Sequence, residues 1–211
     1  MDAPKRMMAI TRLMREHYGD IDERPREPYR TLIGCILSHR TRDENSSRAA
    51  RNLFAEIEGP LDLLTMNPDT LKELIRCSGF YNQKARSIIA ISRVLVDDFD
   101  GIVPDDRATL MGLPGVGPKT ADIVLSYAFE KPAIAVDVHV SRIGRRLGLA
   151  PDDAGPERVK EALESLVPPE SYRFMDNVFV RHGKKYCRNS NPLCSVCFLN
   201  ELCIYPGSQS Q

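Results

Sequence analysis

The apolar side chains of this chain recur with the period of an α-helix over most of its length. Residues three, four and seven positions apart lie on one face of a helix, and five segments show such an apolar stripe. The stripes are Leu32/Ile33/Ile36/Leu37, Ala85/Ile88/Ile89/Leu95, Ala121/Val124/Leu125/Ala128, Val159/Ala162/Leu163/Leu166 and Met175/Val178/Phe179/His182. Proline and glycine residues separate these stripes, and the strict alternation of apolar and polar residues that is typical of β-strands is scarce. The pattern predicts an all-α protein of about ten short helices.

Composition and charge restrict the class of protein further. Of the 211 residues, 42% are hydrophobic and 27% charged, which excludes a disordered chain. No apolar run approaches the roughly 20 residues that span a bilayer, and the first residues lack the apolar segment of a secretion signal. The 29 Lys and Arg residues balance 29 Asp and Glu residues, so any nucleic-acid surface must be a local patch. We therefore expect an intracellular, cytoplasmic protein without a membrane partner.

A glycine-rich turn at residues 112–120 precedes one of the expected helices. Gly115 and Gly117 would permit a tight turn with positive φ, and Pro118 suits the first position of a helix. Backbone amides at such a helix N-terminus bind phosphate groups. A plain corner between two helices would need the same residues. The turn is thus a candidate phosphate site, made of Gly115, Val116, Gly117 and Thr120.

Lys119 lies in the first turn of that helix. The positive end of the helix dipole and partial burial would both disfavour its charged form, which would leave a free amine. A free amine is what Schiff base chemistry requires. The alternative is a solvated lysine that contacts a phosphate as a simple charge.

Asp137 precedes a helical stretch from Val138 to Leu147. An aspartate fills the N-cap position of a helix well. A second role, compatible with the first, is a catalytic carboxylate that handles protons or stabilises a developing sugar cation. His139 could lie near a phosphate, and a structural histidine is the alternative.

Four of the six cysteines crowd into residues 187–203, with the spacing Cys-x6-Cys-x2-Cys-x5-Cys. In an intracellular chain this pattern indicates metal binding rather than disulfides. Four thiolates suit tetrahedral zinc or a [4Fe–4S] cluster, and the spacing alone does not decide between them. Cys35 and Cys77 stand apart and are interpreted as small buried hydrophobic side chains. The candidate metal ligands are Cys187, Cys194, Cys197 and Cys203.

Cationic side chains gather around the same segment of an otherwise neutral chain. They form a local patch that could meet a phosphate backbone, or simply a solvated cationic face. The patch comprises Arg173, Arg181, His182, Lys184, Lys185 and Arg188, with only Asp176 between them.

Together these elements resemble the endonuclease III family of DNA glycosylases, within the helix–hairpin–helix, Gly-Pro-Asp superfamily. The resemblance covers nearly the whole chain, and its specific parts are Leu113-Pro-Gly-Val-Gly-Pro-Lys-Thr120, Ile134-Ala-Val-Asp-Val-His139 and the cysteine spacing. It implies a six-helix barrel domain that carries the hairpin (23–131). It also implies a discontinuous helical domain with a [4Fe–4S] cluster (1–22 and 132–211), and a DNA-binding cleft between the two domains.

The resemblance also implies the reaction and the residues that perform it. A monomer would remove damaged bases, oxidised pyrimidines among them, from double-stranded DNA, and would cut the strand at abasic sites. Lys119 would be the nucleophile that attacks the sugar, and Asp137 the essential carboxylate. The hairpin, His139 and the cationic patch at Lys184, Lys185 and Arg188 would contact DNA, and the four cysteines would hold the cluster.

Two positions depart from the family pattern. The family commonly places a glutamine in the gap that the flipped base leaves, and this sequence has Arg40 there. A second insertion position, usually leucine, is Phe80 in this chain. Both side chains can still stack or wedge. The alternative for Phe80 is a buried core aromatic.

Other functions use the same motifs. A monofunctional glycosylase specific for thymine or other mismatches could share the scaffold. A non-catalytic DNA-binding module could combine the hairpin with a zinc knuckle, and a redox protein could use the cluster itself.

Overall fold

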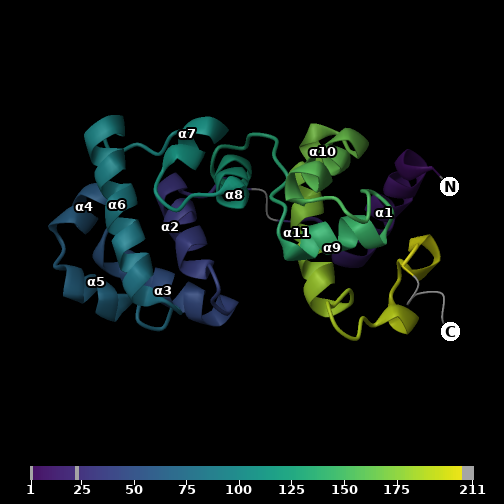
Figure 1. Ribbon diagram of the computed structural model, residues 1–211, viewed down its shortest axis with the longest axis horizontal. Helices are drawn as coiled ribbons and strands as arrows, with labels where there is room; N and C mark the ends of the chain where they lie inside the picture. The colour runs from purple at the N-terminus through teal and green to yellow at the C-terminus, as the bar shows by residue number, and fades with distance from the viewer. Residues whose placement is uncertain (1, 22–23, 206–211) are drawn as a thin grey trace. The chain divides into compact units, whose positions relative to one another are not determined.

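The computed structural model describes residues 2–21 and 24–205, and over these residues it is helical (Figure 1). Eleven α-helices and three short 3-10 helices account for the regular structure of this part of the chain. The predicted all-α class is confirmed. The chain divides into two compact units, Pro25–Lys131 and Met1–Arg24 with Pro132–Gln211. The boundary expected at residues 22–23 lies outside the described residues.

The middle unit contains seven α-helices, drawn in blue to teal in Figure 1. Their bounds are α2 (Pro28–Ser38), α3 (Asp43–Glu56), α4 (Pro60–Thr65), α5 (Pro68–Leu74), α6 (Tyr81–Phe99), α7 (Arg107–Gly112) and α8 (Pro118–Ala128). Helix α2 packs against α3, α6 and α8, and it buries its whole predicted stripe from Leu32 to Leu37. Glu27 caps it by accepting hydrogen bonds from two first-turn amides, and Pro28 occupies the first helical position. Local sequence signals therefore place the central helix of this unit.

The second unit joins the N-terminal helix to the C-terminal part of the chain. Its elements are α1 (Ala3–Tyr18), α9 (Val138–Arg146), α10 (Pro156–Leu166), η1 (Pro169–Ser171), α11 (Tyr172–Lys185), η2 (Cys194–Val196) and η3 (Asn200–Leu202). Met7, Ile10 and Met14 of α1 are fully buried in one core with Phe174 and Phe179 of α11. Burial of large apolar side chains contributes about 1.5–3 kcal/mol each, so α1 is held by its apolar face.

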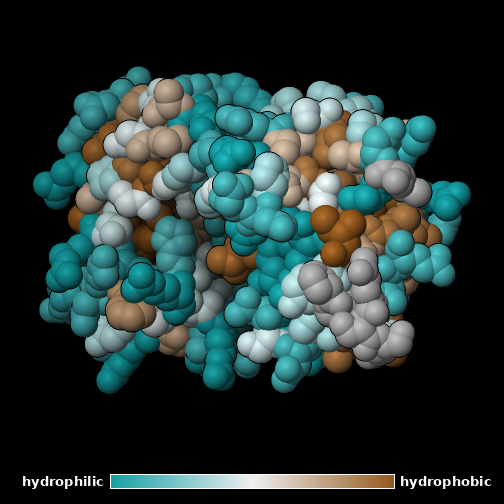
Figure 2. All heavy atoms as spheres, turned by 45° about the vertical axis from the view of Figure 1, so that its right-hand side comes forward, coloured by the Kyte–Doolittle hydropathy of each residue, from teal (hydrophilic) through white to brown (hydrophobic). Residues whose placement is uncertain are grey.

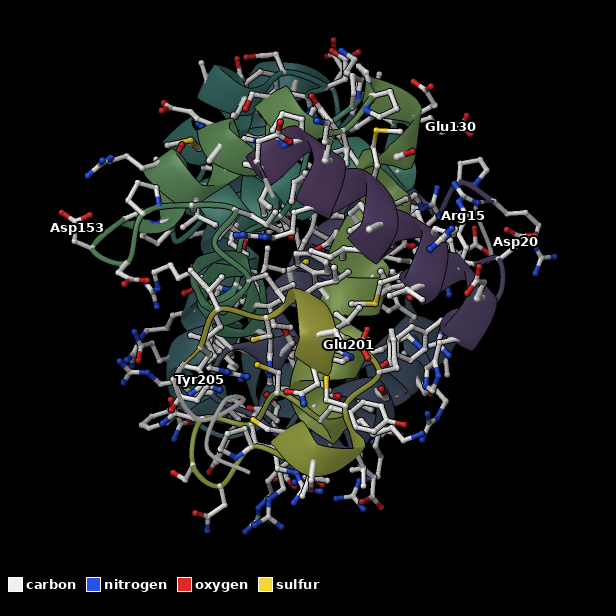
Figure 3. All side chains as sticks on the ribbon, turned by 90° about the vertical axis from the view of Figure 1, so that its right-hand side faces the viewer. Arg15, Asp20, Glu130, Asp153, Glu201 and Tyr205 are labelled. Carbon is white, nitrogen blue, oxygen red and sulfur yellow. The ribbon has the colours of Figure 1, made fainter. Side chains whose placement is uncertain are left out.

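The C-terminal end of α1 also makes contacts through Arg15. Arg15 pairs with Asp20 at 3.2 Å (Figure 3). The guanidinium carbon of Arg15 also lies 4.4 Å from the centre of the Phe174 ring. The surface seen in Figure 2 is mostly hydrophilic, with hydrophobic side chains in separate groups. In the described part of the chain, no helix has both the length and the apolar character to cross a membrane.

Candidate active site and cysteine site

The glycine turn lies between α7 and α8, as the sequence predicts. Gly115 adopts φ +77°, a conformation that glycine reaches at little cost. Gly117 differs from the prediction, because its φ of −102° is open to other residues and its role is the N-cap of α8. A glycine cap has no side chain to accept hydrogen bonds from the first-turn amides. The first turn of α8 therefore has no side-chain cap, and a phosphate oxygen can accept from its amides instead.

An ion pair that the sequence does not reveal holds the two helices of the hairpin. Arg107 of α7 donates through Nε and Nη2 to the two carboxylate oxygens of Asp122 in α8, at 2.9 and 3.2 Å. Asp122 is 2% exposed. Two parallel hydrogen bonds between a guanidinium and a carboxylate fix orientation as well as distance. The hairpin is thus a rigid support for the start of α8.

Lys119 occupies the second position of α8, and its side chain is exposed. The partial burial expected for this lysine is therefore absent, and its amine is accessible to solvent. Its neighbours Val116 and Thr120 are buried, at 6% and 2% exposure. As candidates for DNA contact, these two residues offer their backbone and not their side chains.

Thr120 uses its hydroxyl within the protein. Its Oγ1 lies 3.3 Å from Nε2 of His39, the C-cap residue of α2. Desolvation lowers the pKa of His39, and the positive charges of Lys119 and Lys84 lower it further. His39 thus stands beside the start of α8 as a neutral side chain near neutral pH. Sequence reasoning missed it, because 81 positions separate it from Thr120 and no local pattern joins them.

Arg40 and Phe80 lie together in the middle unit. Both have positive φ, +50° and +59°, which is uncommon for residues other than glycine. The Arg40 guanidinium carbon lies 6.0 Å from the centre of the Phe80 ring. Phe80 is 61% exposed, so the alternative of a core aromatic is wrong. A planar cation and an aromatic ring are thus presented side by side from two separate turns.

Asp137 is the N-cap of α9, as predicted. Its Oδ1 accepts hydrogen bonds from the amides of His139 and Val140 at 2.7 and 2.9 Å. His139 Nδ1 lies 2.8 Å from Nη2 of Arg142. A Cβ atom at Gly183 of α11 would stand 2.6 Å from the same nitrogen, so His139 packs tightly against that helix. These contacts give His139 a structural role.

The four clustered cysteines line one cavity, together with residues of α9 and α11. None of them forms a disulfide. Arg146 Nη1 lies 3.4 Å from Sγ of Cys187, and His182 Nε2 lies 3.5 Å from Sγ of Cys197. Figure 3 shows sulfur atoms in the segment near Glu201. Over residues 2–21 and 24–205, no group of three or more His, Cys, Asp and Glu side chains is arranged to hold a single metal ion.

The donor chemistry of this cavity still fits a metal cluster. Four thiols that face one cavity without forming disulfides supply the ligand set of a [4Fe–4S] cluster. Burial raises the pKa of Cys197 to about 11 and also raises that of Cys194.

The two isolated cysteines differ from each other. Cys35 is buried, as predicted, whereas Cys77 is half-buried and donates to the carbonyl of Asn45 at 3.4 Å.

The cationic patch is smaller than the sequence suggests. Arg173 is 9% exposed, and its Nη2 donates to the carbonyl of Arg24 at 2.8 Å. His182 is 2% exposed. Both belong to the interior of their unit and are withdrawn from the patch. The exposed members that remain, the α11 patch, are Arg181, Lys184, Lys185 and Arg188.

Comparison with known proteins defines the class of protein that carries these features. Residues 33–169 match the model of the HhH-GPD superfamily of base excision DNA repair proteins. The endonuclease III of Thermotoga maritima is 45% identical over 179 residues, which cover 85% of this chain and 84% of that protein. The chain therefore belongs to the endonuclease III family. It is a DNA glycosylase with AP lyase activity in base excision repair, so the predicted family and enzyme class are confirmed.

Solved structures agree with this placement. The structure of a trapped endonuclease III–DNA covalent intermediate, an estranged-adenine complex, matches all of this chain with a TM-score of 0.91 and 33% identity. A thermostable thymine-DNA glycosylase matches 96% of the chain with a TM-score of 0.86 and 25% identity. The alternatives of a mismatch-specific glycosylase or a non-catalytic module are not favoured.

Proposed function

We propose that this enzyme removes oxidised pyrimidine bases from double-stranded DNA and cleaves abasic sites through a Schiff base on Lys119. The observation that carries the proposal is the exposed amine of Lys119 at the start of α8, directly after the glycine hairpin. The hairpin amides would hold a DNA phosphate and so bring the sugar to the amine. The substrate is a duplex with a damaged base or an abasic site, bound by a monomer in the cytoplasm.

The reaction follows from amine chemistry. The lone pair of Lys119 Nζ forms a bond to the sugar C1′, and the damaged base leaves with the electron pair of the glycosidic bond. One amine proton neutralises the departing base. The other passes to O4′ as the C1′–O4′ bond breaks, and the opened sugar then carries a Schiff base at C1′. Loss of a C2′ proton then expels the 3′ phosphate, which breaks the strand on the 3′ side of the abasic site. Water releases the lysine.

Asp137 is assigned to proton handling and to stabilisation of positive charge on the sugar. Because Oδ1 accepts the two capping hydrogen bonds, the position of the carboxylate is fixed by the start of α9. The second oxygen, Oδ2, is the one that we assign to the chemistry.

The residues Cys187, Cys194, Cys197 and Cys203 are assigned as the ligands of a [4Fe–4S] cluster. A cluster with four protein thiolates has no open position for a substrate, so its contribution is to hold the C-terminal segment. Arg181, Lys184 and Lys185 of the α11 patch lie on the helix that leads into this segment, and Arg188 follows its end. We expect the patch to meet the DNA backbone.

A panel of duplexes, each with one defined lesion, tests the proposed function. Strand cleavage is scored with and without alkali, and covalent capture is scored with borohydride. We expect cleavage without alkali and a borohydride-dependent crosslink on oxidised pyrimidines. Excision without any crosslink would contradict the lysine mechanism, because attack by water forms no imine.

The α11 patch leads to a prediction about salt dependence. Replacing Lys184 by glutamine should weaken binding to damaged and undamaged duplexes equally, and should lower the salt slope of log K by about one unit. Titrations of both duplexes at several salt concentrations measure this slope. A variant that loses affinity for the lesion duplex alone would contradict a phosphate contact.

Arg40 and Phe80 lead to a prediction about base flipping. We expect the Arg40→Ala/Phe80→Ala double variant to slow base excision about tenfold or more. Taking a base out of the stack costs a few kcal/mol, and no side chain would then fill the gap that the base leaves. Cleavage at a pre-formed abasic site should fall much less, since no base has to leave the stack. Single-turnover rates on both substrates measure the difference. Equal losses would show that these side chains serve folding instead.

A further inference from the structure

Lys84 is a buried cation in the first turn of α6, with 5% of its surface exposed. Its ammonium donates to the carbonyl of Leu37 at 2.7 Å, to Oγ1 of Thr41 at 2.8 Å and to Oγ of Ser78 at 2.8 Å. These three hydrogen bonds use all three donors of a lysine ammonium. The three acceptors are neutral, and burial lowers the pKa of Lys84 to about 8.

The three acceptors come from two turns that are distant in sequence. Leu37 and Thr41 lie on either side of the turn that follows α2, and Ser78 lies in the turn that precedes α6. Ser78 also donates its hydroxyl to the carbonyl of Leu37 at 2.9 Å. Lys84 therefore ties the two turns to each other and to α6.

Arg40 and Phe80 stand in these same two turns, and both carry the positive φ described above. Such backbone conformations persist only where the surroundings hold them. The turns also touch directly, since a Cβ atom at Gly79 would lie 3.3 Å from the carbonyl oxygen of Arg40. We infer that Lys84 is a positioning residue, which holds the turns of Arg40 and Phe80 so that both side chains enter the vacated stack together.

The charge of Lys84 supports this role. Burying an ammonium costs free energy, and a core position could hold an apolar side chain without that cost. Hydrogen bonds from a charged donor are shorter and stronger than neutral ones, so one ammonium can fix two turns at once. The inference rests on the proposed function, because it is base excision that requires the stack to be filled.

The test combines Lys84→Met with the Arg40→Ala/Phe80→Ala variant in a double-mutant cycle. Lys84→Met alone should slow single-turnover excision of a damaged base about tenfold, and cleavage of a pre-formed abasic site about twofold at most. In the Arg40→Ala/Phe80→Ala background, Lys84→Met should cause little further loss of excision. Lys84→Arg, which keeps the charge and several donors, should recover part of the rate.

Ser92→Ala is the matched control on the same helix. Ser92 is buried, accepts or donates at 2.7 Å with the hydroxyl of Tyr29, and lies two turns of α6 away from Lys84. This variant should lose stability while its ratio of excision to abasic-site cleavage stays at the wild-type value. Thr41→Val, which removes one acceptor, gives a milder second variant if Lys84→Met does not fold.

Two outcomes would overturn the inference in an active wild-type enzyme. In one, Lys84→Met and Ser92→Ala would slow both reactions in the same proportion. In the other, the effect of Lys84→Met would be fully additive with that of the Arg40→Ala/Phe80→Ala change. A wild-type enzyme that neither excises bases nor cleaves abasic sites would instead overturn the proposed function, and this inference with it.

Discussion

Lys119→Gln should reduce base excision and borohydride crosslinking together, by about three orders of magnitude or more. Glutamine has a similar length and keeps the second position of α8, but it has no nucleophilic amine. Affinity for duplex DNA should fall less than about tenfold, because the hairpin amides, which we propose as the phosphate site, are unchanged. Single-turnover excision, covalent capture and binding titrations on one lesion duplex measure the three quantities.

Lys72→Gln is the matched control for this change. Lys72 is a lysine of the same unit that pairs with Asp69 at 2.7 Å on the surface of α5, and its loss should leave all three quantities near wild type. A Lys119→Gln protein that still crosslinks would show that another amine is the nucleophile.

Asp137→Asn separates the carboxylate charge from the helix cap. Asparagine caps a helix about as well as aspartate, so α9 should keep its start while the negative charge is lost. Excision should then be slower, yet some intermediate should still be trapped by borohydride. This result would place Asp137 in proton handling rather than in attack on the sugar.

The parts of this molecule that follow from the sequence are those fixed by neighbours along the chain. The stripes of α2, α8 and α10 predict helices because apolar side chains three and four positions apart share one face. Asp137 predicts the start of α9 because its side chain reaches the amides two and three positions later. The order of the hairpin, the Asp137 segment and the cysteines is likewise local, and it identified the family.

The parts that sequence reasoning missed depend on contacts between distant segments. The Arg107–Asp122 ion pair and the contact of His39 with Thr120 join separate helices, and no spacing rule connects them. Lys84 is the clearest case, because a lysine is rarely buried and two of its three acceptors, Leu37 and Thr41, lie 47 and 43 positions away. Positive φ at Phe80 could not be expected either, since bulky residues seldom adopt it.

The predicted membership of the cationic patch was partly wrong for a related reason. Arg173 and His182 belong to a segment rich in cations, and the sequence alone places them in one surface patch. On α11, however, they point into the core of their unit, where Arg173 meets the carbonyl of Arg24. A helix sends successive side chains to different faces, so a cationic segment divides into buried and exposed members.

The C-terminal segment of the described chain contains little regular structure, so we expect its stability to depend on the cysteine site. Between Tyr186 and Tyr205 the only regular elements are the two 3-10 turns η2 and η3. Leu199 is buried in the core of its unit, and Cys187 and Cys197 pack against the same core. Most backbone hydrogen bonds of this segment join residues two to seven positions apart, and the amide of Ile204 donates to the carbonyl of Arg146 in α9. A cluster held by four thiolates would tie these local turns together.

Cys197→Ser should therefore lower the yield of folded protein and reduce Tm by roughly 10 °C, which corresponds to about 3–4 kcal/mol for a chain of this size. Visible absorbance and iron content should fall with it, whereas the folded fraction should still cleave abasic sites at a rate close to wild type. Cys77→Ser is the control, because Cys77 is half-buried outside the cluster and serine can also donate to the carbonyl of Asn45. A Cys197→Ser protein that is free of iron, yet as stable and as tightly bound to DNA as wild type, would exclude a structural role for the cluster.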